Sequence, residues 1–400
     1  MKNYTVNKMD ILAALFWIMI MGFYTPYQAI YYVYQATIAI VIFIVAFSEV
    51  KGAIKNGIIL LYPCGIVISC VLNKNNILYT QMIRGFVYAL IILDIFLFLN
   101  KFVKKRGSDR LITIFYDMSL LYFIISVVWI IVLAVSNKLE FVIQNEQLFL
   151  GGKFPTVYCF IFFLMFFCLH WSGNKVFHYK IKKYLFIILS ILCIVLSYIL
   201  KASTGIVAIA FFSISVLFLD KLIKIISNPV IAIIAMSISM GVIFALNAIL
   251  ALPIVQTLIV KILHEDLGLT GRMRLYTLLY SLFVKAGIFG NGFGSYVTTS
   301  LEYHGWANAQ NGLAEIVLTY GWWGAISLLA IVFNRLRQRK VELAPLNAAL
   351  LTFIMVAVVE IPYDAKFILL IMLFGVINSR KVEIKSKFPR IFRIKRGKII

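Results

Sequence analysis

Apolar segments recur along the whole chain and are separated by short polar stretches. Each segment approaches the length of about twenty residues that an α-helix needs to cross the hydrocarbon core of a bilayer. We therefore predict an all-α, polytopic membrane protein with about twelve transmembrane helices. They are expected at residues 11–25, 30–48, 57–72, 84–100, 111–135, 154–171, 184–200, 204–219, 229–250, 307–333, 343–359 and 366–378.

The first apolar segment is predicted to be a retained helix and not a signal peptide. It lacks a small-residue cleavage site, and another apolar segment follows it at once. The composition agrees with a membrane protein, because 62% of the 400 residues are hydrophobic and 15% are aromatic. A soluble domain of this size would need more polar side chains to cover its surface.

A single membrane domain, residues 1–400, is the simplest organisation of the chain. No Ser/Gly-rich linker, low-complexity tract or internal repeat divides it. Two connections on the predicted outer side are longer than the others, residues 136–153 and 251–306, and the second is the large extracytoplasmic loop in which an active site would be built. Residues 379–400 form a basic cytoplasmic tail that is expected to bind anionic membrane lipids.

The basic residues are distributed unevenly between the two sides of the predicted membrane domain. If both termini are cytoplasmic, 28 of the 38 Lys and Arg residues fall on the cytoplasmic side, as the positive-inside rule requires. A net charge of +22 with this distribution indicates a membrane protein with no nucleic-acid partner. The other basic residues are Lys74, Arg84, Lys138, Lys153, Lys201, Lys261, Arg272, Arg274, Lys285 and Lys366.

The cysteines and histidines suggest neither a disulfide framework nor a metal site. The five cysteines lie in apolar segments without Cys-x-x-Cys spacing, and the four histidines are scattered along the chain. We therefore expect no metal and no cofactor.

The large loop contains a predicted amphipathic helix that would lie along the outer membrane surface. The stretch TGRMRLYTLLYSLFVKA (270–286) has helical periodicity, with Thr270 as a candidate N-cap. Its cations either bind a ligand or extend to lipid headgroups. The glycine-rich stretch GIFGNGFGSY (287–296) is expected to end the helix in a tight turn.

Polar side chains precede the next span, in NAQNGLAEIVLTYGWWG (308–324). Asn308, Gln310 and Asn311 are suited to hydrogen-bonding sugar hydroxyls without the cost of a buried charge. The alternative role for Asn308 is helix capping. Gly321 and Gly324 indicate close packing of helices.

This order of motifs resembles the C-terminal signature of the O-antigen polymerase and ligase superfamily, and most of all the capsular polysaccharide polymerases of Gram-positive bacteria. The resemblance rests on TGR (270–272), the amphipathic helix, the glycine-rich stretch and the span entry, supported by GGKFPT (151–156) and LKASTG (200–205). It implies a metal-independent glycosyltransferase in the bacterial cytoplasmic membrane. The enzyme would transfer a growing glycan from undecaprenyl diphosphate to a new lipid-linked repeat unit at the outer face, in company with a flippase and a chain-length regulator.

Four outer cations are candidate ligands of the diphosphate leaving group: Arg272, Arg274, Lys153 and Lys201. A developing diphosphate charge needs cations where water is scarce, and the arginine fork binds two phosphate oxygens at once. Arg272 is the foremost candidate because the TGR match includes it. Arg84 would face either water or a lipid phosphate and is not assigned, and Asp94 and Asp117 are either partnered structural acids or part of a pathway.

The sequence departs from the superfamily at the position of a commonly occurring histidine. Gln310, Asn311, nine residues and Gly321 fit the family frame, with glutamine where the histidine belongs. Glutamine cannot act as a general base. The candidates for that role are His304 first, Glu315 second and Glu302 third, and the remaining alternative is a reaction without a base.

Two other functions remain open. A ligase would use the same donor, fold and motifs but transfer the glycan to a different acceptor. A flippase or secondary transporter would carry charged residues near the middle of the membrane and internal repeat symmetry. The sequence favours the polymerase, because its polar residues concentrate in one outer loop.

Overall fold

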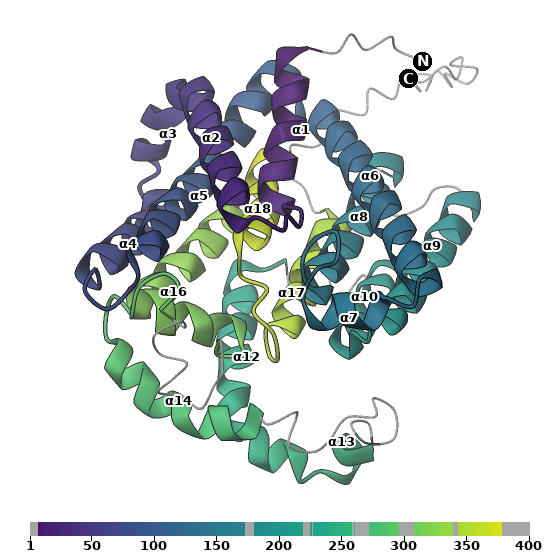
Figure 1. The fold of residues 1–400 in the computed structure, drawn as a ribbon. Coiled ribbons are helices and arrows are strands. Elements are labelled where there is room, and N and C mark those ends of the chain that lie inside the picture. The colour runs from purple at the N-terminus through teal and green to yellow at the C-terminus, as the bar shows by residue number, and fades with distance from the viewer. Residues whose placement is uncertain are drawn as a thin grey trace, which may run out of the picture.

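The computed structural model of the protein describes residues 7–172, 180–218, 225, 227–257, 260, 272–295, 308–338 and 343–377. Throughout these ranges the regular secondary structure is helical, apart from an isolated bridge between Leu148 and Gly151. The all-α prediction is therefore confirmed for the described part of the chain (Figure 1).

Each predicted span overlaps one of the longer helices. These are α1 (Lys8–Met21), α2 (Gln28–Ala46), α4 (Ile58–Leu72), α5 (Tyr79–Arg106), α6 (Ser108–Val135), α8 (Lys153–Ser172), α9 (Lys180–Ile199), α10 (Ser203–Phe218), α12 (Pro229–Leu250), α16 (Gly312–Gln338), α17 (Ala344–Val356) and α18 (Ala365–Val376). The shorter elements are η1 (Phe47–Glu49), α3 (Val50–Lys55), α7 (Leu139–Gln144), α13 (Pro253–Thr257) and α14 (Arg272–Ala286).

Among the described residues, 6 helical segments are long and apolar enough to cross a membrane. They are Ala29–Lys55, Tyr79–Arg106, Ser108–Val135, Lys153–Trp171, Lys182–Ile199 and Gly312–Gln338. The other apolar helices are shorter than a bilayer-spanning helix needs to be. The structure therefore supports a membrane protein, while twelve crossings stay a prediction.

Burial distinguishes a central helix from peripheral ones. In α8, 78% of the apolar window is buried, against 22% for the segment that contains α2 and 28% for α9. A helix that is hydrophobic all round belongs in a core, whereas apolar side chains exposed on outer helices suit a lipid environment. Aromatic rings fill the centre: Trp17 of α1 packs edge-on against Phe162 and Phe166 of α8.

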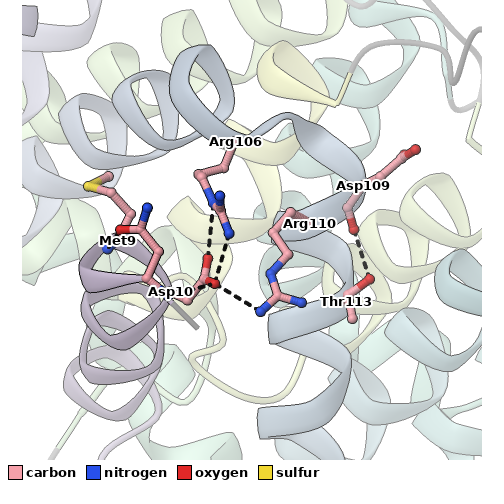
Figure 2. Close-up of polar contacts among 7 residues, drawn as sticks. Met9, Asp10, Arg106, Asp109, Arg110 and Thr113 are labelled. Carbon is pink, nitrogen blue, oxygen red and sulfur yellow. Dashed lines mark hydrogen bonds and ion pairs between the residues drawn. The ribbon is translucent and has the colours of Figure 1, made fainter. Parts of the chain in front are cut away.

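An ion-pair cluster joins α1 to the junction of α5 and α6 (Figure 2). Asp10 is 4% exposed and accepts hydrogen bonds from Arg106 Nη2 at 3.1 Å and Arg110 Nη2 at 2.9 Å. Burial acts to raise the pKa of Asp10, but the hydrogen bonds from Arg110, Arg106 and the Asn7 amide outweigh it and hold the pKa below its ordinary value. The cluster fixes the start of α1 and this basic junction at the same end of the molecule, which we call the Asp10 end.

The helix α14 lies where the sequence predicts an amphipathic helix. Tyr276, Leu279 and Phe283 face inward and are buried, whereas Ser281 and Lys285 are exposed. α14 packs against α16, and with α13 it lies at the opposite end of the molecule from the first turn of α1 (Figure 1). Thr270, its predicted N-cap, lies outside the described residues.

Candidate functional site

The long helix α16 is broken at Gly321, which adopts φ 71° and ψ −172°. In an unbroken helix the Trp322 and Trp323 amides would donate to the Leu318 and Thr319 carbonyls. Here Trp322 and Trp323 instead donate to Gly287 and Ile288, at 3.3 and 3.0 Å. The break therefore frees two carbonyls and two amides inside an apolar segment.

The glycine-rich stretch supplies the missing hydrogen-bond partners. Asn291 and Gly292 donate from their backbone amides to the Leu318 and Thr319 carbonyls, at 2.9 and 3.0 Å. A broken helix at membrane depth is tolerated when neighbouring protein satisfies its backbone in this way. Residues 287–292, which we call the 287–292 segment, thus satisfy the free backbone groups at the break in α16.

Glycine is required on both sides of this contact. Gly290 has φ 71°, and a Cβ there would lie 2.5 Å from the Thr319 carbonyl group and clash with the backbone of Gly321. A Cβ at Gly321 would clash in turn with the Ile288 carbonyl. The close packing that the sequence predicts at Gly321 is present, but it joins a broken helix to a loop and not two regular helices.

The first turn of α16 is organised by Asn311 and Glu315. Asn311 is fully buried, its Oδ1 accepts from the Ala314 amide at 3.1 Å, and its Nδ2 donates to the carbonyls of Ser239 and Val358 at 3.0 and 3.1 Å. Glu315 Oε2 accepts from the Ala309 amide at 2.8 Å. Asn311 is therefore the helix cap, and Glu315 holds the turn that precedes it.

Asn308 and Gln310 bond to each other beside this cap. Asn308 Oδ1 accepts from the backbone and side-chain nitrogens of Gln310, at 3.0 and 2.5 Å. Gln310 has a left-handed φ of 51°, and its carbonyl accepts a hydrogen bond from the Tyr276 hydroxyl at 2.9 Å. That bond ties α14 to the start of α16.

A cavity of about 580 Å³ lies beside the broken helix. Its walls come from the ends of α1 and α2, the first turns of α5 and α16, residues 293–295 and the turn before α18. The polar and aromatic residues that line it are Tyr31, Tyr32, Gln35, Gln81, Arg84, Tyr88, Phe293, Ser295, Glu315, Thr319, Tyr320, Tyr363, Asp364 and Lys366. Mostly apolar walls with a few placed polar groups are typical of a ligand site.

The charged groups of the cavity differ in their pairing. Lys366 Nζ lies 2.8 Å from Asp364 Oδ2, and the Asp364 carboxylate also caps α18. Glu315 accepts from the Ala309 amide and, at 3.3 Å, from the Thr319 hydroxyl. Within the described part of the chain, no carboxylate lies at ion-pair distance from Arg84. The cavity therefore combines Arg84, which has no anionic partner among the described residues, with Glu315, a carboxylate held by hydrogen bonds.

The candidates chosen from the sequence fall into three groups. Glu315 lines the cavity, whereas Asn308, Gln310 and Asn311 form the turn next to it. Lys153 and Lys201 do come together, because Lys153 Nζ donates to the Lys201 carbonyl at 3.0 Å, but they do not line the cavity. Lys201 Nζ pairs with Glu140 at 2.7 Å on the surface, and its hydrogen bond lowers the pKa of Glu140.

Four other candidates cannot be placed by their side chains. For Arg272 and Arg274 the structure describes only the backbone, which lies in the first turns of α14. His304 and Glu302 lie outside the described residues.

The sequence leaves Arg84 without an assigned role, and it does not single out Lys366 or the aromatic walls of the cavity. Arg84 and Lys366 do belong to the minority of basic residues outside the predicted cytoplasmic side. That minority is the signal that would have pointed to them. Their proximity to Glu315 has no signal in the sequence, because it depends on how α5, α16 and α18 pack.

These features define the class of the protein: its described part is helical, with segments long and apolar enough to cross a membrane, a helix broken at a glycine and a cavity with polar groups beside the break. No protein-family model matches the chain, and no match was found among curated proteins or solved structures.

Proposed function

We propose that the protein is a polysaccharide polymerase of the outer face of the bacterial cytoplasmic membrane. It transfers a growing glycan from undecaprenyl diphosphate to a lipid-linked oligosaccharide repeat unit. The proposal rests on the motif order of residues 270–324 and on one structural observation. The glycine-rich stretch and the 310–321 segment, both part of the family resemblance, dock onto each other and together line the cavity.

The chemistry of the cavity suits a glycosyl transfer. Diphosphate is a good leaving group, so that the donor needs a cation to neutralise it and no strong acid. Arg84 and the Lys366–Asp364 pair lie in the cavity wall, and the aromatic rings of Tyr32, Tyr88 and others offer apolar faces for sugar rings. The reacting sugars would occupy the space between α5 and the first turn of α16.

The acceptor hydroxyl must lose a proton during the transfer. Glu315 is the described carboxylate that faces the cavity from α16, and His304 remains the other candidate from the sequence. A general base contributes about 10²- to 10⁴-fold to such a reaction. We assign the role to Glu315 because its carboxylate is held in place by the Ala309 amide and the Thr319 hydroxyl.

A transporter is the second candidate, and Asp94 favours it. This residue lies in the middle of α5 and is fully buried, and neither carboxylate oxygen has a hydrogen-bond partner among the residues that the structure describes. Ionisable residues buried within membrane helices commonly mark ion or proton pathways. A lipid-linked glycan would then be moved across the membrane without chemistry.

The test is to incubate the purified protein with lipid-diphosphate-linked repeat units and to separate the products by size. A ladder of polymers is expected from the wild type. Glu315→Gln, whose amide oxygen still accepts from the Ala309 amide, should lower the rate by about 10²-fold or more. Lys74→Ala, a charge loss on an exposed turn, should leave the ladder unchanged.

Two outcomes would contradict the polymerase. Transfer of a single glycan to a non-saccharide acceptor would identify a ligase. Movement of the lipid-linked glycan across reconstituted vesicles without any ladder would identify a transporter, and in that case Asp94→Asn should abolish the movement.

A further inference from the structure

Arg84 occupies an unusual position in the cavity wall. It lies near the start of α5 and is half-buried. Its guanidinium carbon stands 3.5 Å from the centre of the Tyr32 ring, and Nη1 donates to Gln81 Oε1 at 3.3 Å. The guanidinium group therefore contacts both the Tyr32 ring and the Gln81 amide.

The guanidinium retains unused hydrogen-bonding capacity. An arginine side chain has five N–H donors, and the described side chains accept only from Nη1. Cation–π stacking occupies the face of the guanidinium group and leaves its edge for hydrogen bonds. An edge with several N–H donors matches the oxygens of a phosphate group.

Two of the apolar residues that line the cavity, one next to Arg84 in the sequence and one on α2, are exposed at the surface. Val33 of α2 is 67% exposed and Ile83 of α5 is 44% exposed, and both line the cavity. Three further exposed residues, Ile30, Ile40 and Ile44, continue the surface along α2. Within a bilayer, hydrocarbon chains would cover an apolar helix surface of this kind.

We propose that Arg84 binds the diphosphate of the polyprenyl-linked substrate while its isoprenoid chain lies along α2. The assignment rests on the proposed polymerase function and adds a ligand that the motifs do not contain. Tyr32 and Gln81 position the guanidinium, and the substrate enters from the lipid phase along the exposed apolar side of α2. The sugar attached to the diphosphate then points toward Glu315 across the cavity.

Binding and turnover measured on the same variants test this assignment. Purified protein in detergent is titrated with undecaprenyl diphosphate and, separately, with phosphatidylglycerol, and the complexes are counted by native mass spectrometry. Arg84→Ala should weaken binding of the diphosphate lipid by about tenfold to a hundredfold, the usual loss for a charge-assisted hydrogen-bonding partner. Arg84→Lys should recover only part of the binding, because a lysine lacks the fork.

The matched controls separate positioning from binding. Lys74→Ala removes one positive charge from the exposed turn before α5 and should bind as the wild type does. Tyr32→Leu keeps Arg84 but removes the stacking ring, and should weaken binding by a smaller factor than Arg84→Ala. In the ladder assay Arg84→Ala should lower kcat/KM for the donor, because it removes a cation that binds the diphosphate in both the ground state and the transition state, while Lys74→Ala should leave kcat/KM unchanged.

Each further result has a defined meaning. Equal binding of the diphosphate lipid by Arg84→Ala and wild type overturns the assignment, even if both polymerise. Equal affinity of the wild type for phosphatidylglycerol and undecaprenyl diphosphate also overturns it, because the site would then hold an ordinary lipid headgroup. Arg84-dependent binding of the diphosphate lipid without any polymer would leave the site standing and reject the polymerase function.

Discussion

At the scale of single residues, the polar side chains around the start of α16 have two different roles. Asn311 is fully buried. Its side chain caps α16 by accepting from the Ala314 amide and donates to the carbonyls of Ser239 and Val358. Glu315 holds its own turn but also faces the cavity. We therefore assign Asn311 to structure and Glu315 to both structure and chemistry.

The role of Asn311 can be measured as stability. Asn311→Ala should lower the free energy of unfolding by about 2 kcal/mol, because it removes a helix cap and the side-chain donor to the Ser239 and Val358 carbonyls. Asn308→Ala, which changes only the partly buried bonds to Gln310, should cost less. Thermal unfolding in detergent compares the two variants. Equal melting temperatures would contradict the structural role.

The ion pairs of Asp10 predict how the stability of the protein depends on pH. Its folded-state pKa is lowered, so the ion pairs contribute stability above the pKa of the unfolded chain, about 3.9. That contribution is lost as the pH falls through the still lower pKa of the folded protein. Asp10→Asn should therefore destabilise the protein by about 1 to 3 kcal/mol at pH 7 and by less at pH 3. Asp109→Asn, an exposed carboxylate in the same region, serves as the control. A melting-temperature loss for Asp10→Asn that is the same at both pH values would contradict the ion-pair explanation.

At the scale of elements, the broken helix α16 and the glycine-rich segment 287–292 form one unit. The two segments are brought together by the Trp322, Trp323, Asn291 and Gly292 amides. Polar contacts from α4 support them, since Ser69 donates to the Thr319 carbonyl at 3.0 Å and Asn73 to the Gly290 carbonyl at 2.9 Å. The unit also borders the cavity, which is lined by Thr319 of α16 and by Phe293, the residue that directly follows the 287–292 segment.

Substitution of the glycines tests the unit. Gly290→Ala and Gly321→Ala should each lower the yield of folded protein and abolish activity, because a Cβ at either position meets backbone and both residues have a positive φ. Gly241→Ala in α12, where a Cβ meets nothing, should be neutral or slightly stabilising. Size-exclusion profiles in detergent report the result, and a well-folded, active Gly321→Ala variant would contradict the role of the break.

The sequence predicts the positions of the helices better than it predicts where a helix breaks or which segments pack together. Apolar periodicity locates the helices, including α14, because a helix that buries one face must repeat its apolar residues. It does not predict the break at Gly321, because the residues directly before and after it, 316–320 and 322–333, are mainly apolar and read as one continuous helix. The break depends on hydrogen bonds to residues 287–292, which are not neighbours of Gly321 in the sequence.

At the scale of the whole molecule, the two ends of the helical domain differ in chemistry. The Asp10 end gathers Arg106 and Arg110, whereas the start of α5 and the turn before α18 enclose the cavity. The distribution of basic residues predicts that the Asp10 end is cytoplasmic. The site could be predicted only in part, because the approach of residues 84, 315 and 364 arises from packing between distant segments.

Cysteine labelling of intact cells tests the predicted orientation. In a background in which the five native cysteines are replaced, Ser300→Cys and Glu302→Cys should react with an impermeant thiol reagent added outside, and Arg337→Cys should not. Permeabilised cells, in which all three positions should react, provide the control. External labelling of position 337 would reverse the orientation and place the cavity on the cytoplasmic side.

Reversible chemical modification of the cavity wall tests most directly whether the polymer is made in the cavity. Ile361 lines the cavity, and Ile361→Cys in the same cysteine-free background should form a ladder from lipid-linked repeat units. Reaction with a bulky methanethiosulfonate should stop the ladder and a reductant should restore it, while Lys74→Cys on the exposed turn should remain active throughout. Unchanged ladders from the modified Ile361→Cys protein, or no ladder before modification while the wild type makes one, would contradict the cavity as the active site.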